Sequence, residues 1–340
     1  METLYLTIVE ALRVRVSQIS AIWANPRLRH TAWLSLTILG FFVFALGLWA
    51  SRLPSPFASP PTLSCNCGPF GLDAFSYYGA HGGADAYAGI VNTSGAGLYR
   101  YAPLWLPLLA PFGHLPFYTF AYLVAALELA SLFYLTRRWF FAAFLFWPVF
   151  LELYEANIYL LMGALIVFAL RHSGDSRERF PRSALVYVAL AFTKVTTASL
   201  IFWHVFRREW GAVIVALAAT GAILAAGLIY DPATWWAWLH SLANTAPVAD
   251  YAPLGLPLFA RLPVAVGLLA LGARFRWPAL VVVAAFLSLP AIWWHSYSLL
   301  IAIPAAAGAC QRKREIWHAG SVSAGTADPA VLVKPAESPA

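Results

Sequence analysis

Long apolar segments separated by short basic clusters set the pattern of this chain. Segments long enough to cross the hydrocarbon core of a bilayer, about 30 Å thick, recur throughout residues 31–310. Because basic residues gather in cytoplasmic loops, placing every basic cluster on that side predicts about ten crossings, in a range of about nine to twelve, with both termini in the cytoplasm. The predicted spans are 32–50, 115–136, 139–154, 156–171, 184–194, 196–206, 211–230, 260–273, 277–293 and 296–310. The sequence therefore predicts an all-α, multi-pass bundle in the plasma membrane.

Two short predicted helices, 184–194 and 196–206, are less regular than the others. Residues 183–206 could form one ordinary helix, but Arg207 would then lie on the outer side, against the charge rule. A hairpin of two short helices avoids this conflict. Its tip, residues 194–197, is expected to point into an external cavity, because a turn in the membrane needs protein or water to satisfy its backbone.

The predicted outer loops are long and carry aromatic and polar residues rather than basic ones. The first covers about 51–102 and the second about 231–259. A proline-rich stretch follows the first loop and is too interrupted for a regular crossing, so it is expected to be re-entrant or interfacial. The membrane domain is expected to cover 32–310, between a cytoplasmic N-terminal segment, 1–31, and a cytoplasmic tail, 311–340, with the composition of a disordered end.

Composition argues against a soluble enzyme and against a nucleic-acid partner. The chain is 61% hydrophobic and 11% charged, whereas charged residues make up about a quarter of a soluble domain. Its net charge of +7 comes from the clusters beside the apolar segments, so topology explains it. No residue pattern has zinc spacing and no glycine-rich phosphate loop is present, so no metal or other cofactor is expected. Nothing resembles a cleavable signal peptide, so the first span is expected to be retained.

Asp73 stands out because it follows directly on a chain that otherwise reads as lipid-embedded helix. An ionisable side chain where a span meets water costs free energy unless it has a partner or a task, so it indicates function. Tyr77 lies four residues on and would share a helical face with Asp73. The alternative is that Asp73 only caps a helix N-terminus, which is a frequent role of aspartate.

The segment LDAFSYYGAHGGADAY, at 72–87, resembles a motif of glycosyltransferase family 87, whose members are membrane enzymes of the GT-C class that use polyprenyl-phosphate sugar donors. That motif has the form D-x-x-x-Y-x-x-A followed by G-x-x-x-Y, and the matching positions are Asp73, Tyr77, Ala80, Gly83 and Tyr87. Later resemblances follow in the family's order, at Tyr101-Ala-Pro103, Leu115-Pro116, Lys194, and Pro290, Trp294 and His295.

Two departures from the family pattern are visible. Thr197 stands where a proline is usual, and Asn157, in YEANIYLLMG, stands where a Gly-Gln or Gly-Asn pair is common. For that reason the stretch around Asn157 is given no role.

The resemblance implies an inverting transfer of a hexose, with mannose as the expected sugar. The donor would be a polyprenyl-phosphate sugar and the acceptor an extracytoplasmic glycolipid or polysaccharide, with membrane lipids around the protein. Asp73 matches the family's general base, which would deprotonate the acceptor hydroxyl as it attacks the anomeric carbon. The expected substrate-binding residues are Tyr77, Tyr78, Asp85, Tyr87, Arg100, Tyr101, Lys194 and His295.

Several of these assignments have a structural alternative. Lys194 would stabilise the phosphate leaving group, or it would be a snorkelling lysine at a helix end. Arg100 would be a second phosphate ligand or an interfacial anchor. His295 would bind phosphate or acceptor hydroxyls, or it would be an interfacial histidine beside tryptophans. Asp85 is the alternative acid in the same loop.

A membrane transporter or flippase of a lipid-linked or small polar substrate is the rival interpretation. It too would place an acid, a lysine and a broken hairpin in a membrane cavity. Transporters commonly show repeated halves, and no internal repeat is visible in the sequence.

Overall fold

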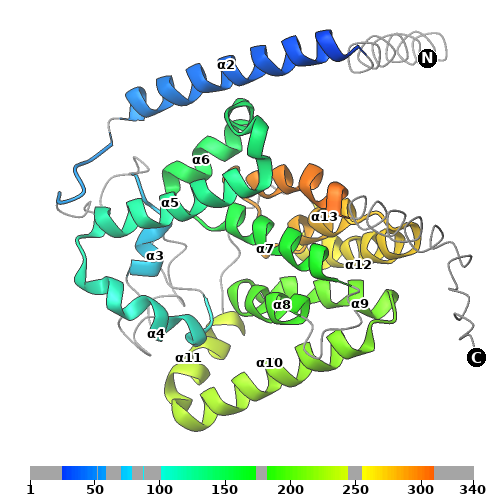
Figure 1. Cartoon of the computed structure of the whole chain (residues 1–340). Helices are drawn as coiled ribbons and strands as arrows, with labels where there is room; N and C mark the ends of the chain where they lie inside the picture. The colour runs from blue at the N-terminus through cyan, green and yellow to red at the C-terminus, as the bar shows by residue number, and fades with distance from the viewer. Residues whose placement is uncertain are drawn as a thin grey trace, which may run out of the picture.

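The computed structural model describes residues 25–51, 53–58, 70–78, 87, 101–173, 182–243 and 255–309, and the regular structure within them is helical. Figure 1 labels the α-helices, and 3₁₀ helices are named η here. The elements are α2 (Pro26–Ser51), α3 (Ala74–Tyr78), η2 (Pro103–Trp105), α4 (Leu106–Leu109), η3 (Ala110–His114), α5 (Phe117–Thr136), η4 (Arg137–Trp139), η5 (Phe141–Leu145), α6 (Trp147–Glu155), α7 (Tyr159–His172), α8 (Arg182–Thr193), η6 (Val195–Ile201), α9 (Phe202–Phe206), α10 (Trp210–Tyr230), α11 (Pro232–Ala243), α12 (Leu258–Phe275), α13 (Ala279–Leu287) and η8 (His295–Ala302).

Four helices in the described residues are long and apolar enough to cross a membrane. They are Leu28–Ser51, Phe117–Trp139, Trp210–Tyr230 and Leu258–Phe275. A fifth crossing is possible if Trp147–Glu155 and Tyr159–His172, which are bent by 110°, count as one broken span. The chain is therefore a helical membrane protein, and the structure does not confirm the predicted count of about ten crossings.

The predicted spans 139–154, 277–293 and 296–310 are interrupted rather than regular. The first becomes η4, η5 and α6, and the second ends as a helix at Leu287, just before Pro290. Proline cannot donate a helical hydrogen bond and clashes with the preceding turn, which explains the break before Pro290. The proline-rich stretch after residue 102 forms three short helical pieces, η2, α4 and η3, as its prolines predict.

The helix α2 lies along one side of the bundle, with most of its large apolar side chains exposed (Figure 1). It packs against η5 through Phe41 and Phe141, whose ring centroids lie 5.4 Å apart. Gly40 makes this approach possible, because a Cβ there would collide with the carbonyl oxygen of Phe141. An apolar surface of this extent is expected of a helix that faces lipid.

The helix α7 begins inside the bundle, and side chains take up the N–H groups of its first turn. A helix N-terminus has no backbone acceptors for these groups, and leaving them unbonded away from water is costly. The Ile158 N–H donates to Asn157 Oδ1 at 2.8 Å, and the Tyr159 N–H donates to Glu152 Oε1. The Leu160 and Leu161 N–H groups both donate to Glu128, at 2.9 Å to Oε2 and at 3.1 Å to Oε1. Glu128 and Glu152 are fully buried. Two acidic side chains and one amide thus stabilise the break between α6 and α7.

Three helical segments, α5, α7 and η6 with α9, run in the same direction through the bundle. α7 runs from Tyr159 to His172 and carries Arg171 in its last turn. The segment formed by η6 and α9 follows Lys194 and ends just before Arg207. α5 begins against α3 and ends before Arg137. The arginine clusters therefore gather at the ends of these helices that are remote from α3 and from the break before α7.

Candidate active site

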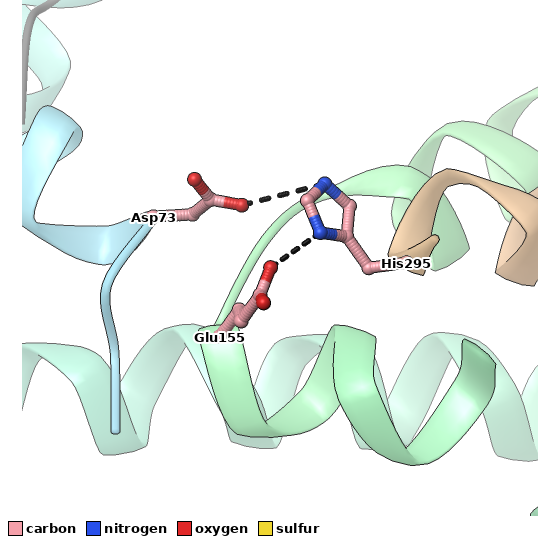
Figure 2. A group of neighbouring side chains, drawn as sticks. All are labelled: Asp73, Glu155 and His295. Atoms are coloured by element: carbon pink, nitrogen blue, oxygen red, sulfur yellow. Dashed lines mark ion pairs between the residues drawn. The ribbon is translucent and has the colours of Figure 1, made fainter. Parts of the chain in front are cut away.

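Asp73, Glu155 and His295 meet at the break between α6 and α7, although they come from distant parts of the chain (Figure 2). Asp73 directly precedes α3, Glu155 is the last residue of α6, and His295 is the first residue of η8. His295 Nδ1 contacts Glu155 Oε2, and His295 Nε2 lies 3.6 Å from Asp73 Oδ2. The His295 side chain is nearly buried and stacks on the Tyr159 ring, with 5.6 Å between ring centroids.

Backbone hydrogen bonds fix Asp73 against α6. Its N–H donates to the carbonyl of Glu155 at 3.0 Å, and the N–H of Gly71 donates to the carbonyl of Tyr154 at 2.9 Å. Gly71 has φ +78°, in the region that favours glycine, and a Cβ there would lie only 2.7 Å from Ala121 Cβ. A glycine two residues before Asp73 is therefore required for this close docking.

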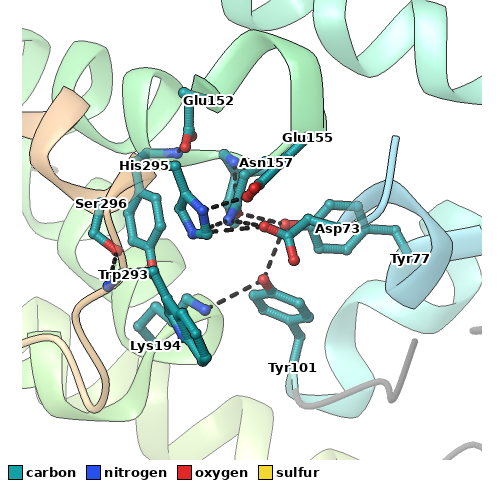
Figure 3. Close-up of polar contacts among 12 residues, drawn as sticks. Asp73, Tyr77, Tyr101, Glu152, Glu155, Asn157, Lys194, Trp293, His295 and Ser296 are labelled. Carbon is teal, nitrogen blue, oxygen red and sulfur yellow. Dashed lines mark hydrogen bonds and ion pairs between the residues drawn. The ribbon is translucent and has the colours of Figure 1, made fainter. Parts of the chain in front are cut away.

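Asn157 joins the acid to the histidine (Figure 3). Its Oδ1 accepts hydrogen bonds from the Ile158 N–H at 2.8 Å and from the Tyr77 hydroxyl at 2.9 Å. Because a backbone N–H can only donate, these bonds fix the orientation of the amide, and Nδ2 must face Asp73 Oδ2, at 2.5 Å, and His295 Nε2, at 3.0 Å. His295 Nε2 then acts as an acceptor, so its proton sits on Nδ1 and is donated to Glu155.

A chain of hydrogen bonds connects Lys194 to Asn157, and its direction follows from the same argument. Tyr77 gives its only hydroxyl proton to Asn157, so at the 2.9 Å contact between the two hydroxyls Tyr101 donates to Tyr77. Lys194 Nζ donates to the Tyr101 hydroxyl at 3.3 Å and lies 4.7 Å from the centroid of the Tyr101 ring. The ammonium group of Lys194 thus heads a chain of donors that ends on the Asp73 carboxylate.

The Asp73 carboxyl group can still accept a further hydrogen bond or a proton. Of its two oxygens only Oδ2 is hydrogen-bonded by the described residues, and 29% of its side chain remains exposed. Burial raises the pKa of the Asp73 carboxyl above its usual value, and Glu155 raises it further, while the charge of Lys194 and the hydrogen bond from Asn157 lower it. The Asp73 side chain makes no hydrogen bond to α3. It therefore does not cap the N-terminus of that helix, which was the alternative role considered from the sequence.

Tyr78 and Tyr87 support the site without reaching Asp73. The Tyr87 hydroxyl donates to the carbonyl of Tyr101 at 2.8 Å and is buried, so it holds Tyr101 in place. The Tyr78 hydroxyl donates to the carbonyl of Leu115 at 2.7 Å, and its ring packs on Phe117. Asp85 and Arg100, the other two predicted residues, lie outside the described residues.

The sequence interpretation was wrong to give the stretch around Asn157 no role, because Asn157 and Glu155 contact Asp73 or His295 directly. A signal was present: Glu152, Glu155 and Asn157 interrupt an otherwise apolar segment. Polar and ionisable residues inside a membrane segment mark function by default.

Asp73, Glu155 and His295 also form a group that could hold a metal ion. Each offers one ligand atom, and these atoms lie within 4.8 Å of one another. Carboxylate oxygen and imidazole nitrogen are common donors to divalent metals. No metal site was predicted from the sequence, because the three residues come from separate segments and have no zinc spacing.

The comparisons with known proteins now give the family. The model of glycosyltransferase family 87 matches residues 99–310, more than half of the chain. That region includes Glu155, Asn157, Lys194 and His295, whereas Asp73 and Tyr77 precede it. Searches of curated proteins and of solved structures gave no match. The chain therefore belongs to glycosyltransferase family 87 and is a membrane glycosyltransferase.

Proposed function

We propose that the protein transfers a hexose, with mannose as the expected sugar, from a polyprenyl phosphate to an extracytoplasmic glycolipid or polysaccharide, with inversion at the anomeric carbon. Membership of the family supports a sugar donor and an acceptor. The observation that carries the mechanism is the Asp73 carboxylate, held by Asn157 through one oxygen and left with the other oxygen unbonded. The rival interpretation as a transporter or flippase has no support from the comparisons.

Asp73 acts as the general base of this transfer. As the acceptor oxygen bonds to the anomeric carbon, its proton moves to Asp73 Oδ1, and the bond from that carbon to the phosphate oxygen breaks. A raised pKa suits this role, because a base is most effective when its pKa approaches the working pH. Asn157 holds the carboxylate in place, so that little freedom is lost when the acceptor arrives.

Lys194 stabilises the leaving phosphate. Its ammonium group lies 4.7 Å and 5.5 Å from the centroids of the Tyr101 and Tyr159 rings, on the same side of the bundle as His295. A fixed positive charge beside a developing phosphate lowers the barrier without a metal ion. Transfer should therefore survive a chelator, and loss of activity with EDTA that is restored by a divalent ion would assign the Asp73, Glu155 and His295 group to a metal instead.

The test is sugar transfer by the full-length protein reconstituted in lipid, with a panel of radiolabelled polyprenyl-phosphate sugars and a membrane lipid extract as acceptor. Wild type should form product, and Asp73→Asn should lower the rate by roughly 10²–10⁴-fold, the usual contribution of a general base. Glu209→Gln is the matched control, because it makes the same chemical change in an acid at the other end of the bundle. Equal rates for wild type and Asp73→Asn would overturn the role of Asp73, and no product from any donor would overturn the donor class.

A further inference from the structure

A second polar site lies at the other end of the bundle from Asp73. It is a pocket of about 500 Å³ between the ends of α5 and α7 and the helical turns after η8. Tyr134, Thr136, Arg137, Arg138, Arg171 and Gly308 are among the residues that line it. The proposed transfer reaction uses none of them.

Positive charge in this pocket has no acidic partner among the described residues. Arg137, Arg138 and Arg171 line it and no carboxylate does. The ion pairs among the described residues involve His204 or Arg207 with Glu209, and His295 with Asp73 or Glu155. Three arginines around one cavity, with no carboxylate of the described residues to neutralise them, indicate that the cavity takes an anionic ligand.

Arg171 is half-buried and held in position, whereas Arg137 and Arg138 line the pocket with exposed side chains. Arg171 Nη1 donates to the Tyr134 hydroxyl at 2.8 Å, and its guanidinium carbon lies 4.9 Å from the centroid of the Tyr134 ring. Arg137 has φ +48°, a backbone conformation that a side-chain-bearing residue rarely adopts. This turn ends α5 and allows two successive arginines to line the pocket.

The position of the pocket along the helices places it at a membrane boundary. α5 has 20 residues, and at 1.5 Å per residue it is about 30 Å long, close to the thickness of the hydrocarbon core. Its first turn packs on Tyr78 near Asp73, and its last turn lines the pocket. Tyr134 and Trp139 lie at the same level, as aromatic residues commonly do where a bilayer meets water.

From these observations we infer that the pocket binds the phosphate of an anionic phospholipid head group, drawn from the leaflet opposite the Asp73 site. Arginine binds phosphate oxygens through paired N–H groups, and basic pockets between membrane helices are suited to lipid head groups. Pro304 and Ala305, in the helical turns that follow η8, give the pocket an apolar wall beside these charges. This inference does not depend on which sugar or acceptor the enzyme uses.

The experiment measures lipid retained by the full-length protein, purified from nanodiscs that mix phosphatidylcholine with phosphatidylglycerol. Wild type should retain phosphatidylglycerol in preference to phosphatidylcholine. The double variant Arg137→Gln/Arg138→Gln should weaken this preference by roughly 5-fold for each arginine removed, since one basic residue near a membrane surface contributes about 1 kcal/mol. The matched control is Arg274→Gln/Arg276→Gln, two exposed arginines at the end of α12 that do not line the pocket.

Gly308 provides a second pair of variants that leaves the arginines intact. A Cβ at Gly308 meets nothing within 4 Å, so a longer side chain can be added there without a collision at its base. Gly308→Glu should lower retention of phosphatidylglycerol because its carboxylate competes for the arginines, whereas Gly308→Gln, of the same size, should not.

Three outcomes would overturn the inference. Equal retention by wild type and the pocket variants would show that the pocket is not the site. An equal loss in Arg274→Gln/Arg276→Gln would indicate attraction by basic charge in general. Displacement of the lipid by millimolar inorganic phosphate or glycerol phosphate would make a soluble phosphate, rather than a lipid, the ligand. Size-exclusion profiles and sugar transfer at the wild-type rate would show that the variants are folded.

Discussion

Asp73 and Glu209 each lie beside a histidine, Asp73 near one end of the bundle and Glu209 at the other. Glu209 is fully bonded: it accepts from His204 Nδ1 at 2.5 Å, from Arg207 Nε at 2.7 Å and from Ser173 Oγ at 3.0 Å. Burial alone would raise its pKa, but the hydrogen bonds from His204 and Arg207 and the charge of Arg207 lower the pKa of Glu209 to about 2.

Asp73 differs in each of these respects. One of its oxygens has no hydrogen bond from the described residues, and burial raises its pKa. Glu209 therefore stays ionised and fixes the turn between α9 and α10, whereas Asp73 retains a place for a proton. The comparison indicates that a carboxylate beside a histidine stays ionised when its partners saturate it, and can take up a proton when they do not.

The largest effect on the contrast between Asp73 and Glu209 is expected from removing Asn157, the side chain that holds Asp73 in place. Asn157→Leu keeps the side-chain size but deprives Asp73, His295 and Tyr77 of a partner. We expect kcat/KM for sugar transfer to fall about 10²-fold, because a small misplacement of a catalytic group costs that much.

Ser288→Ala is the control for Asn157→Leu. Ser288 is fully buried and bonds to Ser199 at 2.9 Å, away from the site, so its loss should affect stability and leave transfer within about twofold of wild type. Similar rates in both variants would refute the positioning role of Asn157.

Lowering the pH should distinguish Glu209 from Asp73 by the effect of each on the free energy of unfolding. Because the pKa of Glu209 is lower in the folded state than the ordinary 4.5, its contribution is complete above that value and disappears as pH falls towards about 2. This loss is up to about 3 kcal/mol. Thermal unfolding between about pH 6 and pH 2.5 should show it in wild type and should show a flatter dependence in Glu209→Gln.

Asp73→Asn should behave in the opposite way. Its folded pKa is raised, so ionised Asp73 opposes folding at neutral pH, and the amide should leave the melting temperature unchanged or higher while transfer is lost. A lower melting temperature in Asp73→Asn would mean that Asp73, like Glu209, is a structural carboxylate.

The smallest effects are expected at two adjacent tyrosines, Tyr77 and Tyr78, whose hydroxyl groups have different partners. Tyr77→Phe removes the hydrogen bond to Asn157, and we expect transfer to fall about tenfold, the value of one hydrogen bond near 1.4 kcal/mol. Tyr78→Phe removes only the bond to the Leu115 carbonyl. It should lower the free energy of unfolding by about 1 kcal/mol and change transfer less than about twofold. Equal rates in the two variants would show that the chain from Lys194 to Asn157 has no part in transfer.

Hydropathy and charge predict the long helices of this fold well. The predicted spans 32–50, 115–136, 211–230 and 260–273 correspond to α2, α5, α10 and α12, because a long apolar helix in lipid needs no partner to satisfy its backbone. The predicted segments 156–171, 184–194 and 196–206 also lie close to α7, α8 and the pair η6 and α9. The 110° bend between α6 and α7 could not be predicted in this way. Ala156 adopts a left-handed backbone, φ 52°, and turns the chain between α6 and α7 without a glycine or proline to mark the bend.

Motif order predicted part of the candidate site. Asp73, Tyr77, Tyr101, Lys194 and His295 were proposed from sequence, and the structure brings them together. Glu155 and Asn157 were missed because the stretch around Asn157 departs from the family pattern and was therefore given no role. Their importance depends on the bend that places the end of α6 beside Asp73, and no local pattern records that contact.

Glu128 has a consequence for how the protein is made. It lies near the middle of α5, and among the described residues its carboxyl group bonds to N–H groups of α7. During synthesis α5 reaches the membrane before α7 exists, so its acidic side chain must first enter lipid without these partners, at a cost of about 2.5–3.5 kcal/mol. A nascent chain truncated before α7 should therefore insert α5 poorly, as glycosylation mapping can measure, and Glu128→Ala should restore insertion. Because α5 is synthesised before α7, we expect stable insertion of α5 in the bilayer to depend on the completion of α7.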